Sequence, residues 1–491
     1  MSTIFGSLNT ALRALQTMQR SIDVTGHNVA NAATPGYSRQ KTLLSAGDPY
    51  SVPALNRQNY GQVGTGVTIE KVQRYRANFL DTQIRQETLM QKGWEVRRDA
   101  LQQVEVAFNE PSDTAMSGRL GEFWNAWNNL ATSPDSSATR AHVAETAAAF
   151  SASMRETYRQ LSNFQGELDD RIAMQVQQVN DLAHRIADLN GSIRMVQSIS
   201  QQPNDLRDER DKLLTELSGI VEVDSYEDEN GAVTVSLGGR WLVSDQSVSE
   251  LGVEPDPANT QASAGLMLNR VIWAKSGDVA QINGIALEGG LPSLATERLR
   301  GELGGALIAR DLLIPDKLNQ LDEMANTLIG AVNNLHQTGY GLDGTSTGGD
   351  FFSGTGARDI ALSNYISADY NRIATAGTAN SLGDGSKALS IAQLQNSLLM
   401  KGGTTTIGDF YRATVVSLGQ EAQQASTMTQ SHELLTQHLQ SKQDEIAGVS
   451  LDEEMTYMLQ YQRTYQAAAR MMTTVDEMLD KVVNGMGVVG R

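Results

Sequence analysis

The strongest pattern for enzyme chemistry in this chain is a histidine-containing stretch near its C-terminal end. A zinc-metalloprotease helix places two histidines four residues apart on one face, with a glutamate between them as the general base. His432 and Glu433 fit this pattern, but residue 436 is Thr, and His438 lies six residues from His432 on another face. The motif therefore lacks a ligand, and we predict neither a metal site nor a catalytic residue here.

Thiol and phosphate-binding chemistry are excluded in a similar way. The chain has no cysteine, so it forms no disulfide, thiolate metal site or thiol nucleophile. The Gly-rich stretch 339–356 is not preceded by a strand or followed by the Lys-Ser/Thr of a phosphate cradle, and Asp343 and Asp350 do not provide the alternating acids of a calcium loop. We expect no cofactor, and we predict an ordered turn region fixed by Phe351 and Phe352.

The charged run at residues 203–211 is the other candidate for chemistry. Its sequence is Pro-Asn-Asp-Leu-Arg-Asp-Glu-Arg-Asp, and Asn204 or Asp205 suits the start of a helix. The run could form a metal or substrate site. Because acids and bases at i,i+4 spacing are typical of exposed helix surfaces, we favour a solvated helix face.

Composition favours a helical, multidomain protein and opposes nucleic-acid binding. The 491 residues exceed one ordinary domain, and 40% are apolar but only 5% aromatic. The formal net charge of −18 opposes contact with phosphates and lies almost wholly between the two ends of the chain. The apolar stretch 306–314 is broken by Arg310 and Asp311, so we expect no membrane-spanning helix. The first twenty residues are amphipathic, so we expect no cleaved signal peptide.

Both ends carry a regular apolar stripe with steps of four and three residues, the spacing at which helices pack together. The N-terminal stripe consists of Ile4, Leu8, Ala11, Leu15, Met18, Ile22, Thr25 and Val29. The C-terminal stripe consists of Leu451, Met455, Met458, Gln462 and Tyr465 and, after a slip in phase, Ala468, Met472, Val475, Leu479, Val482 and Met486. Because chain ends are usually polar unless a partner holds them, we predict that the two helices pack in a coiled-coil-like manner, against each other or against another subunit.

Between the ends we predict a mainly α protein whose helical-bundle body is interrupted by an outer β-rich domain. Helical periodicity extends from 78 to 217 with breaks at 110–113 and 133–135, and 139–202 forms one long helix or two stacked helices. Alternating residues and glycine turns indicate short strands after 220, Pro315 marks a later helix break, and 407–446 is helical. The predicted divisions are 1–60 (terminal helix domain, N-terminal part), 61–219 (body, first part), 220–295 (β-rich insertion), 296–449 (body, second part, with a Gly-rich turn region at 339–385) and 450–491 (terminal helix domain, C-terminal part).

Short motifs at both ends resemble those of a known family. Asn28-Val29-Ala30-Asn31 and Thr34-Pro35-Gly36-Tyr37-Ser38-Arg39-Gln40 resemble the N-terminal signature of the bacterial flagellar axial proteins, which comprise rod, hook and hook-associated proteins. Tyr461–Arg470 and Thr474–Met478 resemble the matching C-terminal signature. Within this family the chain is most similar to the hook-associated proteins. The signature residues are Asn28, Asn31, Thr34, Pro35, Gly36, Tyr37, Gln462, Tyr465 and Ala467.

This resemblance implies a structural, non-enzymatic component of the bacterial flagellum that polymerises at the distal end of the hook, where hook and filament join. It also implies an extracellular location reached through the flagellar type III export apparatus without signal cleavage. The implied partners are further copies of the chain, the hook protein, a second hook-associated junction protein and an export chaperone at the C-terminal helix.

Two alternatives stay open. One is a hook or distal-rod protein of the same family. The other is an extracellular hydrolase or glycan-binding module within the β-rich insertion, where Trp241 and Trp273 could line a site. We favour both tryptophans as core residues of small strands.

Overall fold

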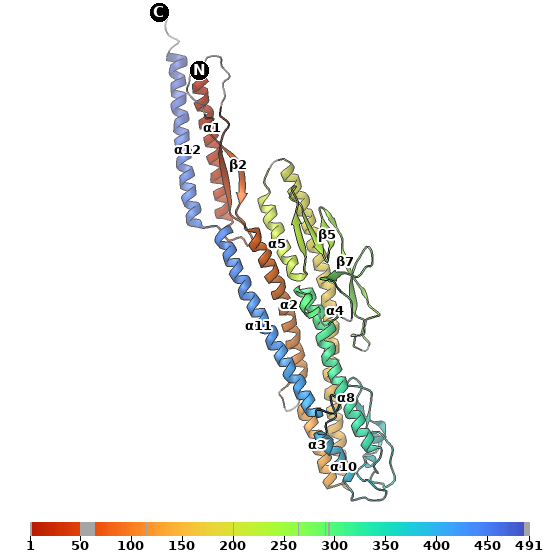
Figure 1. Ribbon diagram of the computed structural model, residues 1–491. Coiled ribbons are helices and arrows are strands. Elements are labelled where there is room, and N and C mark those ends of the chain that lie inside the picture. Colours follow the sequence, from red (N-terminus) through yellow and green to blue (C-terminus); the bar gives the residue numbers. More distant parts are fainter. Residues whose placement is uncertain are drawn as a thin grey trace, which may run out of the picture.

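The computed structural model describes residues 2–49, 64–110, 112, 115–199, 201–263, 265–289, 291–292 and 295–485, and it forms a long helical rod (Figure 1). The α-helices are α1 (Ser2–Ala30), α2 (Asn78–Phe108), α3 (Met116–Thr132), α4 (Ser137–Ser198), α5 (Asn204–Ile220), α6 (Ala295–Arg298), α7 (Gly301–Ile308), α8 (Ile314–His336), α9 (Asn364–Ala368), α10 (Ser386–Gln393), α11 (Ile407–Ala447) and α12 (Leu451–Asp480). The strands are β1 (Gln40–Ala46), β2 (Val67–Arg74), β3 (Asp224–Glu227), β4 (Val233–Leu237), β5 (Arg240–Ser244), β6 (Ser247–Val248), β7 (Leu251–Pro255), β8 (Asn269–Trp273), β9 (Gln281–Ile282), β10 (Ile285–Ala286), β11 (Phe352–Ser353) and β12 (Ala361–Leu362).

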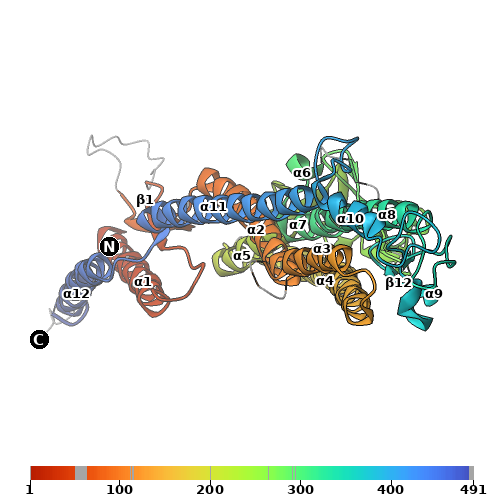
Figure 2. The same ribbon diagram turned by 90° about the horizontal axis from the view of Figure 1, so that it is seen from below.

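The helical body is built along α4, a single helix of 62 residues, so the predicted long helix is one helix and not two, and it ends at Ser198. The Ser136 hydroxyl accepts a hydrogen bond from the Thr139 amide at 3.4 Å and caps its start. Helix α11 lies against α2, and Figure 2 shows α11 extending along the body. No helix in the described part of the chain is long and apolar enough to cross a membrane.

Two hydrophobic cores lie inside the body. The first joins α2, α3, α4, α8, α10 and α11 around an aromatic group formed by Phe123, Trp124, Trp127, Phe351 and Phe352. Phe351 and Phe352 are fully buried, which confirms their predicted role in fixing the Gly-rich region. The second core joins α4, α5 and α7 to the small sheets. No described residue before 94 or after 425 belongs to either core.

The segment after α5 forms small antiparallel sheets, as its alternating residues predict. One sheet has the order β3-β4-β5-β6, and β7 pairs with β8. The alternating residues start at Val221, but Val221 directly follows the end of α5 and is buried in the second core, so strand pairing starts only at Asp224. Trp273 is buried as expected. The expectation for Trp241 is wrong, since it lies on the outer face of β5 with 62% of its surface exposed.

The helix containing Pro315 does not break there. Helices α7 and α8 are continuous through a π-helical segment, Ala309–Leu313. Proline has no amide hydrogen and its ring clashes with the preceding turn, and a widened turn relieves that clash. Arg310 and Asp311 are both fully buried, and the Arg310 guanidinium pairs with Asp311 at 2.7 Å and with Asp169 of α4 at 2.6 Å.

The two ends of the chain lie side by side at one end of the rod, where α1 packs against α12 (Figure 1). A second face of α1 is covered by the hairpin of β1 and β2. The alternating run Val67–Val72 of β2 is typical of a strand, whereas the β1 sequence Gln-Lys-Thr-Leu-Leu-Ser-Ala lacks clear alternation. Polar contacts join hairpin and helix: the Thr17 hydroxyl donates to the carbonyl of Val67 at 3.2 Å, and the Ser21 and Thr42 hydroxyls lie 2.9 Å apart.

Candidate functional site

The site consists of the terminal pair, α1 and α12, and its attachment to the body. Helix α12 turns one stripe toward α1. Its buried and half-buried members with a 4-3 spacing are Glu454, Met458, Tyr461, Ala468, Met472, Val475, Leu479 and Val482, and Tyr465, 38% exposed, continues the spacing. The steps continue without a slip. The predicted slip in phase is therefore absent: Met458 and Tyr465 of the predicted first half lie on this stripe, whereas Met455 and Gln462 lie beside it and are exposed.

Glu454 explains this difference. It is only 2% exposed, and its carboxylate accepts hydrogen bonds from Asn28 Nδ2 at 2.9 Å and from Arg39 Nε at 2.7 Å. A buried charge is costly unless it is paired, so an acid is not expected in a helix seam. A stripe defined by apolar residues therefore leaves Glu454 out. The unbroken 4-3 rhythm from 454 to 482 was the signal that could have found it.

An apolar face of α12 stays uncovered beside this seam. Leu451, Met455 and Leu459 are spaced by four residues, and each is more than half exposed. We refer to these three residues as the outer apolar face. Scattered exposed apolar residues are common on proteins, but a contiguous patch marks an interaction surface.

The signature turn after α1 is organised by Asn28, which is 1% exposed. Its Nδ2 also donates to the carbonyl of Gln40 at 2.8 Å, and its Oδ1 accepts from the Gln40 amide at 3.0 Å and from the Tyr37 hydroxyl at 2.8 Å. Gly36 has φ +85°, a left-handed conformation that favours glycine. The signature residues therefore fold the chain back from α1 into β1.

The signature turn contacts the charged run at the start of α5. The Asp208 carboxylate accepts from both the amide and the hydroxyl of Ser38 at 2.8 Å and pairs with Arg74 at 2.9 Å. Asp211 pairs with Arg74 at 2.8 Å and with Arg76 at 3.5 Å. Burial alone raises the pKa of Asp211, but these arginines outweigh that effect and hold its pKa below the usual range.

The expectation that this run is a solvated helix face is therefore wrong for its central residues. Asp208, Arg210 and Asp211 are buried, because β2 and the following segment bring Arg74 and Arg76 against α5. Arg210 extends to the other side, where it donates to Asn190 Oδ1 at 3.3 Å and to the carbonyl of Gly231. Within the described residues, no group of three or more His, Cys, Asp or Glu is arranged to hold a metal ion.

Further polar contacts attach the terminal pair to the body. Gln40 donates from Nε2 to Asp205 at 2.7 Å, and its Oε1 accepts from Asn204 at 3.1 Å. The Arg39 amide donates to the carbonyl of Ala447 at 2.8 Å, close to Gly448, where α11 ends. Because neither hydrophobic core extends into this region, hydrogen bonds and ion pairs hold the pair to the rod.

The other predicted packing residues lie along the same two helices. Met18 and Val475 are buried, and Leu8, Leu15, Ile22, Val29, Met458, Met472, Leu479 and Val482 are half-buried. The side chain of Ile4 and all of Met486 lie outside the described residues. Of the signature residues, Asn31 and Tyr37 are half-buried, and Thr34, Pro35, Gly36, Gln462, Tyr465 and Ala467 are exposed.

The motifs considered for enzyme chemistry have other partners. His432 Nδ1 lies 2.7 Å from Glu87 on α2, and the Thr436 hydroxyl donates to the His432 carbonyl at 2.8 Å. Residues 344–348 have the Gly-x-Ser-x-Gly spacing of a hydrolase nucleophile. They lie in a turn region without the strand and helix that position such a serine, and the Ser346 hydroxyl donates to Asp343.

Comparison with known proteins agrees with this arrangement. Residues 101–352 match the helical domain of flagellar hook-associated protein FlgK, residues 8–37 match the flagella basal body rod protein family, and residues 440–485 match the C-terminal region of the flagellar basal body rod FlgEFG proteins. Flagellar hook-associated protein 1 of Bacillus subtilis (strain 168) is 31% identical over the whole of both chains. The Salmonella typhimurium protein of the same name is 22% identical, over 97% of this chain and 99% of its own.

A solved structure shares the fold. The flagellar hook junction protein FlgK from Burkholderia pseudomallei superposes with a TM-score of 0.61 at 15% identity and covers 76% of this chain and 100% of its own. The matched FlgK domain includes α4 and most of both cores, and the two rod-protein matches fall on α1 and on the end of α11 with α12. This chain therefore belongs to the flagellar hook-associated protein 1 family and is a structural component of the bacterial flagellum.

Proposed function

We propose that the chain polymerises at the distal end of the flagellar hook and forms the junction between hook and filament, with the terminal pair packing subunits together. One observation carries this proposal. The terminal pair projects from the rod, contributes to neither hydrophobic core, and keeps Leu451, Met455 and Leu459 exposed on α12 (Figure 1). Burying such a face against a neighbouring copy removes apolar surface from water and favours assembly.

The packing residues in this proposal are those of the two stripes: Ile4, Leu8, Leu15, Met18, Ile22 and Val29 of α1, and Leu451, Met455, Met458, Tyr465, Met472, Val475, Leu479 and Val482 of the C-terminal segment. Some of them already join α1 to α12 within one chain. The exposed members contact the neighbouring copies.

The proposal includes further partners and a route to the cell exterior. The hook protein lies on one side of the junction and a second hook-associated protein on the other. An export chaperone covers α12 before assembly, because flexible methionines such as Met455, Met471 and Met478 adapt to different partners and are exposed there. The chain leaves through the type III apparatus without losing an N-terminal signal, and it performs no catalysis.

The domain limits follow the predicted divisions 1–60, 61–219, 220–295, 296–449 and 450–491. The end of α5 at Ile220 and the start of α12 at Leu451 support two of these limits. The β-rich domain is then an insertion on the outer side of the rod, and the helical body spans the remainder.

Binding of the purified chain to isolated hooks tests this function. Gold-labelled chain added to hooks that lack filaments is expected at one end of each hook in electron micrographs, and filament protein should extend only from labelled ends. A chain of the same charge but unrelated fold is the control. Label along the sides of the hook, or none, would contradict the proposal.

A further inference from the structure

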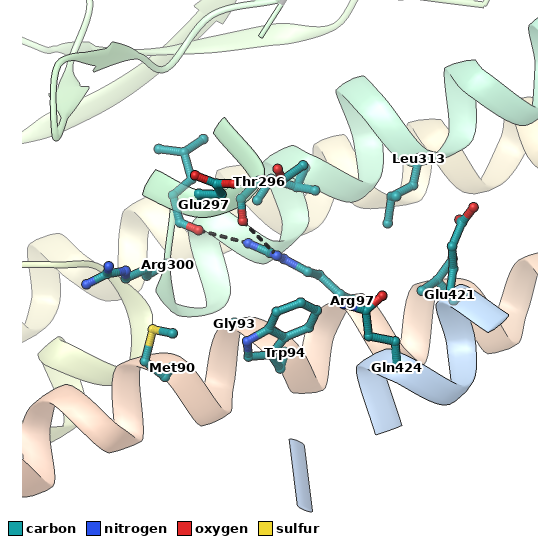
Figure 3. A pocket seen from close by; sticks show the side chains of 13 residues that line it. Met90, Gly93, Trp94, Arg97, Thr296, Glu297, Arg300, Leu313, Glu421 and Gln424 are labelled. Atoms are coloured by element: carbon teal, nitrogen blue, oxygen red, sulfur yellow. Dashed lines mark hydrogen bonds between the residues drawn. The ribbon is translucent and has the colours of Figure 1, made fainter. Parts of the chain in front are cut away.

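A cavity of about 530 Å³ lies in the body, away from the terminal pair (Figure 3). One wall is α2, which contributes Met90, Gly93, Trp94 and Arg97, and a second wall is the segment from Thr296 to Arg300. Glu421 and Gln424 of α11 close the third side. Its volume falls within the range of small-molecule sites in proteins, about 300 to 1,000 Å³.

Glycines fix the walls of this cavity. A Cβ atom at Gly93 would lie 3.0 Å from the Gly301 amide nitrogen, and one at Gly305 would lie 2.6 Å from the Gly93 carbonyl oxygen. Helices α2 and α7 therefore touch through their backbones at this crossing. A close backbone contact of this kind holds two walls of the cavity in a set position.

Arg97 is a buried cation without a counterion. It is 7% exposed, and its guanidinium donates to the backbone carbonyls of Thr296 at 3.0 Å and Leu299 at 2.9 Å (Figure 3). Among the described residues, no carboxylate lies within ion-pair distance of it, and its buried Nε–H has no acceptor. Burial lowers the pKa of Arg97 to about 10, so it stays charged near neutral pH. A guanidinium has five N–H donors, and most of those of Arg97 stay open.

The surroundings of Arg97 suit an anion attached to an apolar group. The Trp94 ring lies 4.6 Å from the guanidinium carbon, and Leu101, Ile308 and Leu313 add apolar lining. The Glu421 carboxylate at the opposite side is already engaged by Lys317 at 3.1 Å. Glu297 and Arg300 also line the cavity, and Arg300 pairs with Glu222 at 3.8 Å. Arg97 is the one charged side chain of this lining that is buried, and an ion pair to a buried charge is stronger than one in water.

We propose that this cavity is a binding site for a carboxylate carried on an apolar body, with Arg97 as the carboxylate-binding residue and Trp94 as the surface on which the apolar part rests. Two sources have this chemistry. One is a free organic acid, and the other is a Glu or Asp side chain of a neighbouring copy of this acidic chain in the polymer.

Isothermal titration calorimetry of the full-length monomer with sodium phenylacetate tests the site. Phenylacetate should bind at least about tenfold more tightly than the neutral analogue phenylacetamide, the ratio expected from one charge-assisted hydrogen bond. Binding should be lost in Arg97→Met and in Gln424→Trp, a substitution that puts a bulky ring on the third side of the cavity and keeps the Arg97 guanidinium. Arg98→Met, at the adjacent half-buried position outside the cavity lining, is the matched control and should bind as the unmodified chain does.

Equal binding of acid and amide, or binding that survives both Arg97→Met and Gln424→Trp, would overturn the proposal. Arg97 also holds two backbone carbonyls, so circular dichroism must show that each variant is folded. If Arg97→Met is unfolded, the result for Gln424→Trp decides. Repeating the titration on chain bound to hooks then distinguishes the two sources of the carboxylate. If phenylacetate still binds, the natural ligand is a free organic acid. If phenylacetate no longer binds, a carboxylate of the neighbouring copy occupies the cavity.

Discussion

Ser38 gives both its backbone amide and its hydroxyl to the carboxylate of Asp208, each at 2.8 Å. These two residues are 170 positions apart, one in the turn after α1 and the other in the first half of α5. The same carboxylate pairs with Arg74 of β2. One buried acid therefore connects the terminal pair, the hairpin and the body.

Removing this acid should loosen the attachment. Asp208→Ala removes the acceptor of both Ser38 hydrogen bonds and one of the two carboxylates that pair with Arg74, which keeps Asp211. Leaving the buried Ser38 donors unpaired costs about 2 kcal/mol. Hydrogen exchange of residues 38–40 and 72–76 should become faster, while exchange in α4 stays slow. Glu209→Ala, on the exposed neighbour, is the control. Unchanged exchange in Asp208→Ala would show that the junction does not depend on this residue.

Glu454 should stabilise the terminal pair within one chain. Glu454→Ala removes a buried carboxylate that accepts from Asn28 and Arg39. Asn28 keeps its bond to the Gln40 carbonyl and Arg39 keeps the exposed Glu453, so we expect a cost of about 2 kcal/mol. Limited proteolysis should then cut within α12 at lower protease concentration. Glu453 pairs with Arg39 from an exposed position, so Glu453→Ala should have little effect. Equal sensitivity of the two variants would contradict this account.

These two acids show where prediction from the sequence succeeded and where it failed. Helix positions followed from periodicity, and α2, α3, α4, α11 and α12 lie where it indicated. The burial of Glu454 and Asp208 was not predicted, because a local pattern treats an acid as solvated. Such a pattern does not show a partner that lies more than a hundred positions away in the sequence. Arg74 and Arg76 become partners of Asp208 only after β1 and β2 pair, and the β1 sequence has no strong strand signal.

The outer apolar face should matter for assembly and not for monomer stability. Replacing Leu451, Met455 and Leu459 by Ser removes side chains that are already more than half exposed in the monomer. The melting temperature should change by only a few degrees, and binding to isolated hooks should fall at least tenfold. Serine substitutions at Val416, Leu434 and Leu435, exposed on α11, are the matched control. Hook binding that falls equally in both variants would speak against a specific role for α12.

His336 should make the body less stable in acid. Burial lowers its pKa to about 4, below the value near 6.5 in an unfolded chain. Nδ1 lies 2.7 Å from the carbonyl of Gly349, and Nε2 accepts from the amide of Ala374 at 3.0 Å, so the folded ring is neutral. Its contribution is fully present above pH 6.5 and is lost as pH falls toward 4, by about 3 kcal/mol.

Urea unfolding at pH 7 and pH 4.5 measures this effect. The loss of stability between the two pH values should be smaller in His336→Gln than in the unmodified chain. His142→Gln, at an exposed position, should show the full loss. An identical pH dependence in His336→Gln would mean that other groups cause the acid sensitivity.

The most direct test of the central claim is to delete residues 451–491 and measure both folding and hook binding. Because neither hydrophobic core includes a described residue after 425, the shortened chain should keep the helical signal and the unfolding transition of the body. It should no longer bind to the ends of isolated hooks. A folded, shortened chain that binds hooks as well as the full chain would contradict the proposal that the terminal pair packs the subunits.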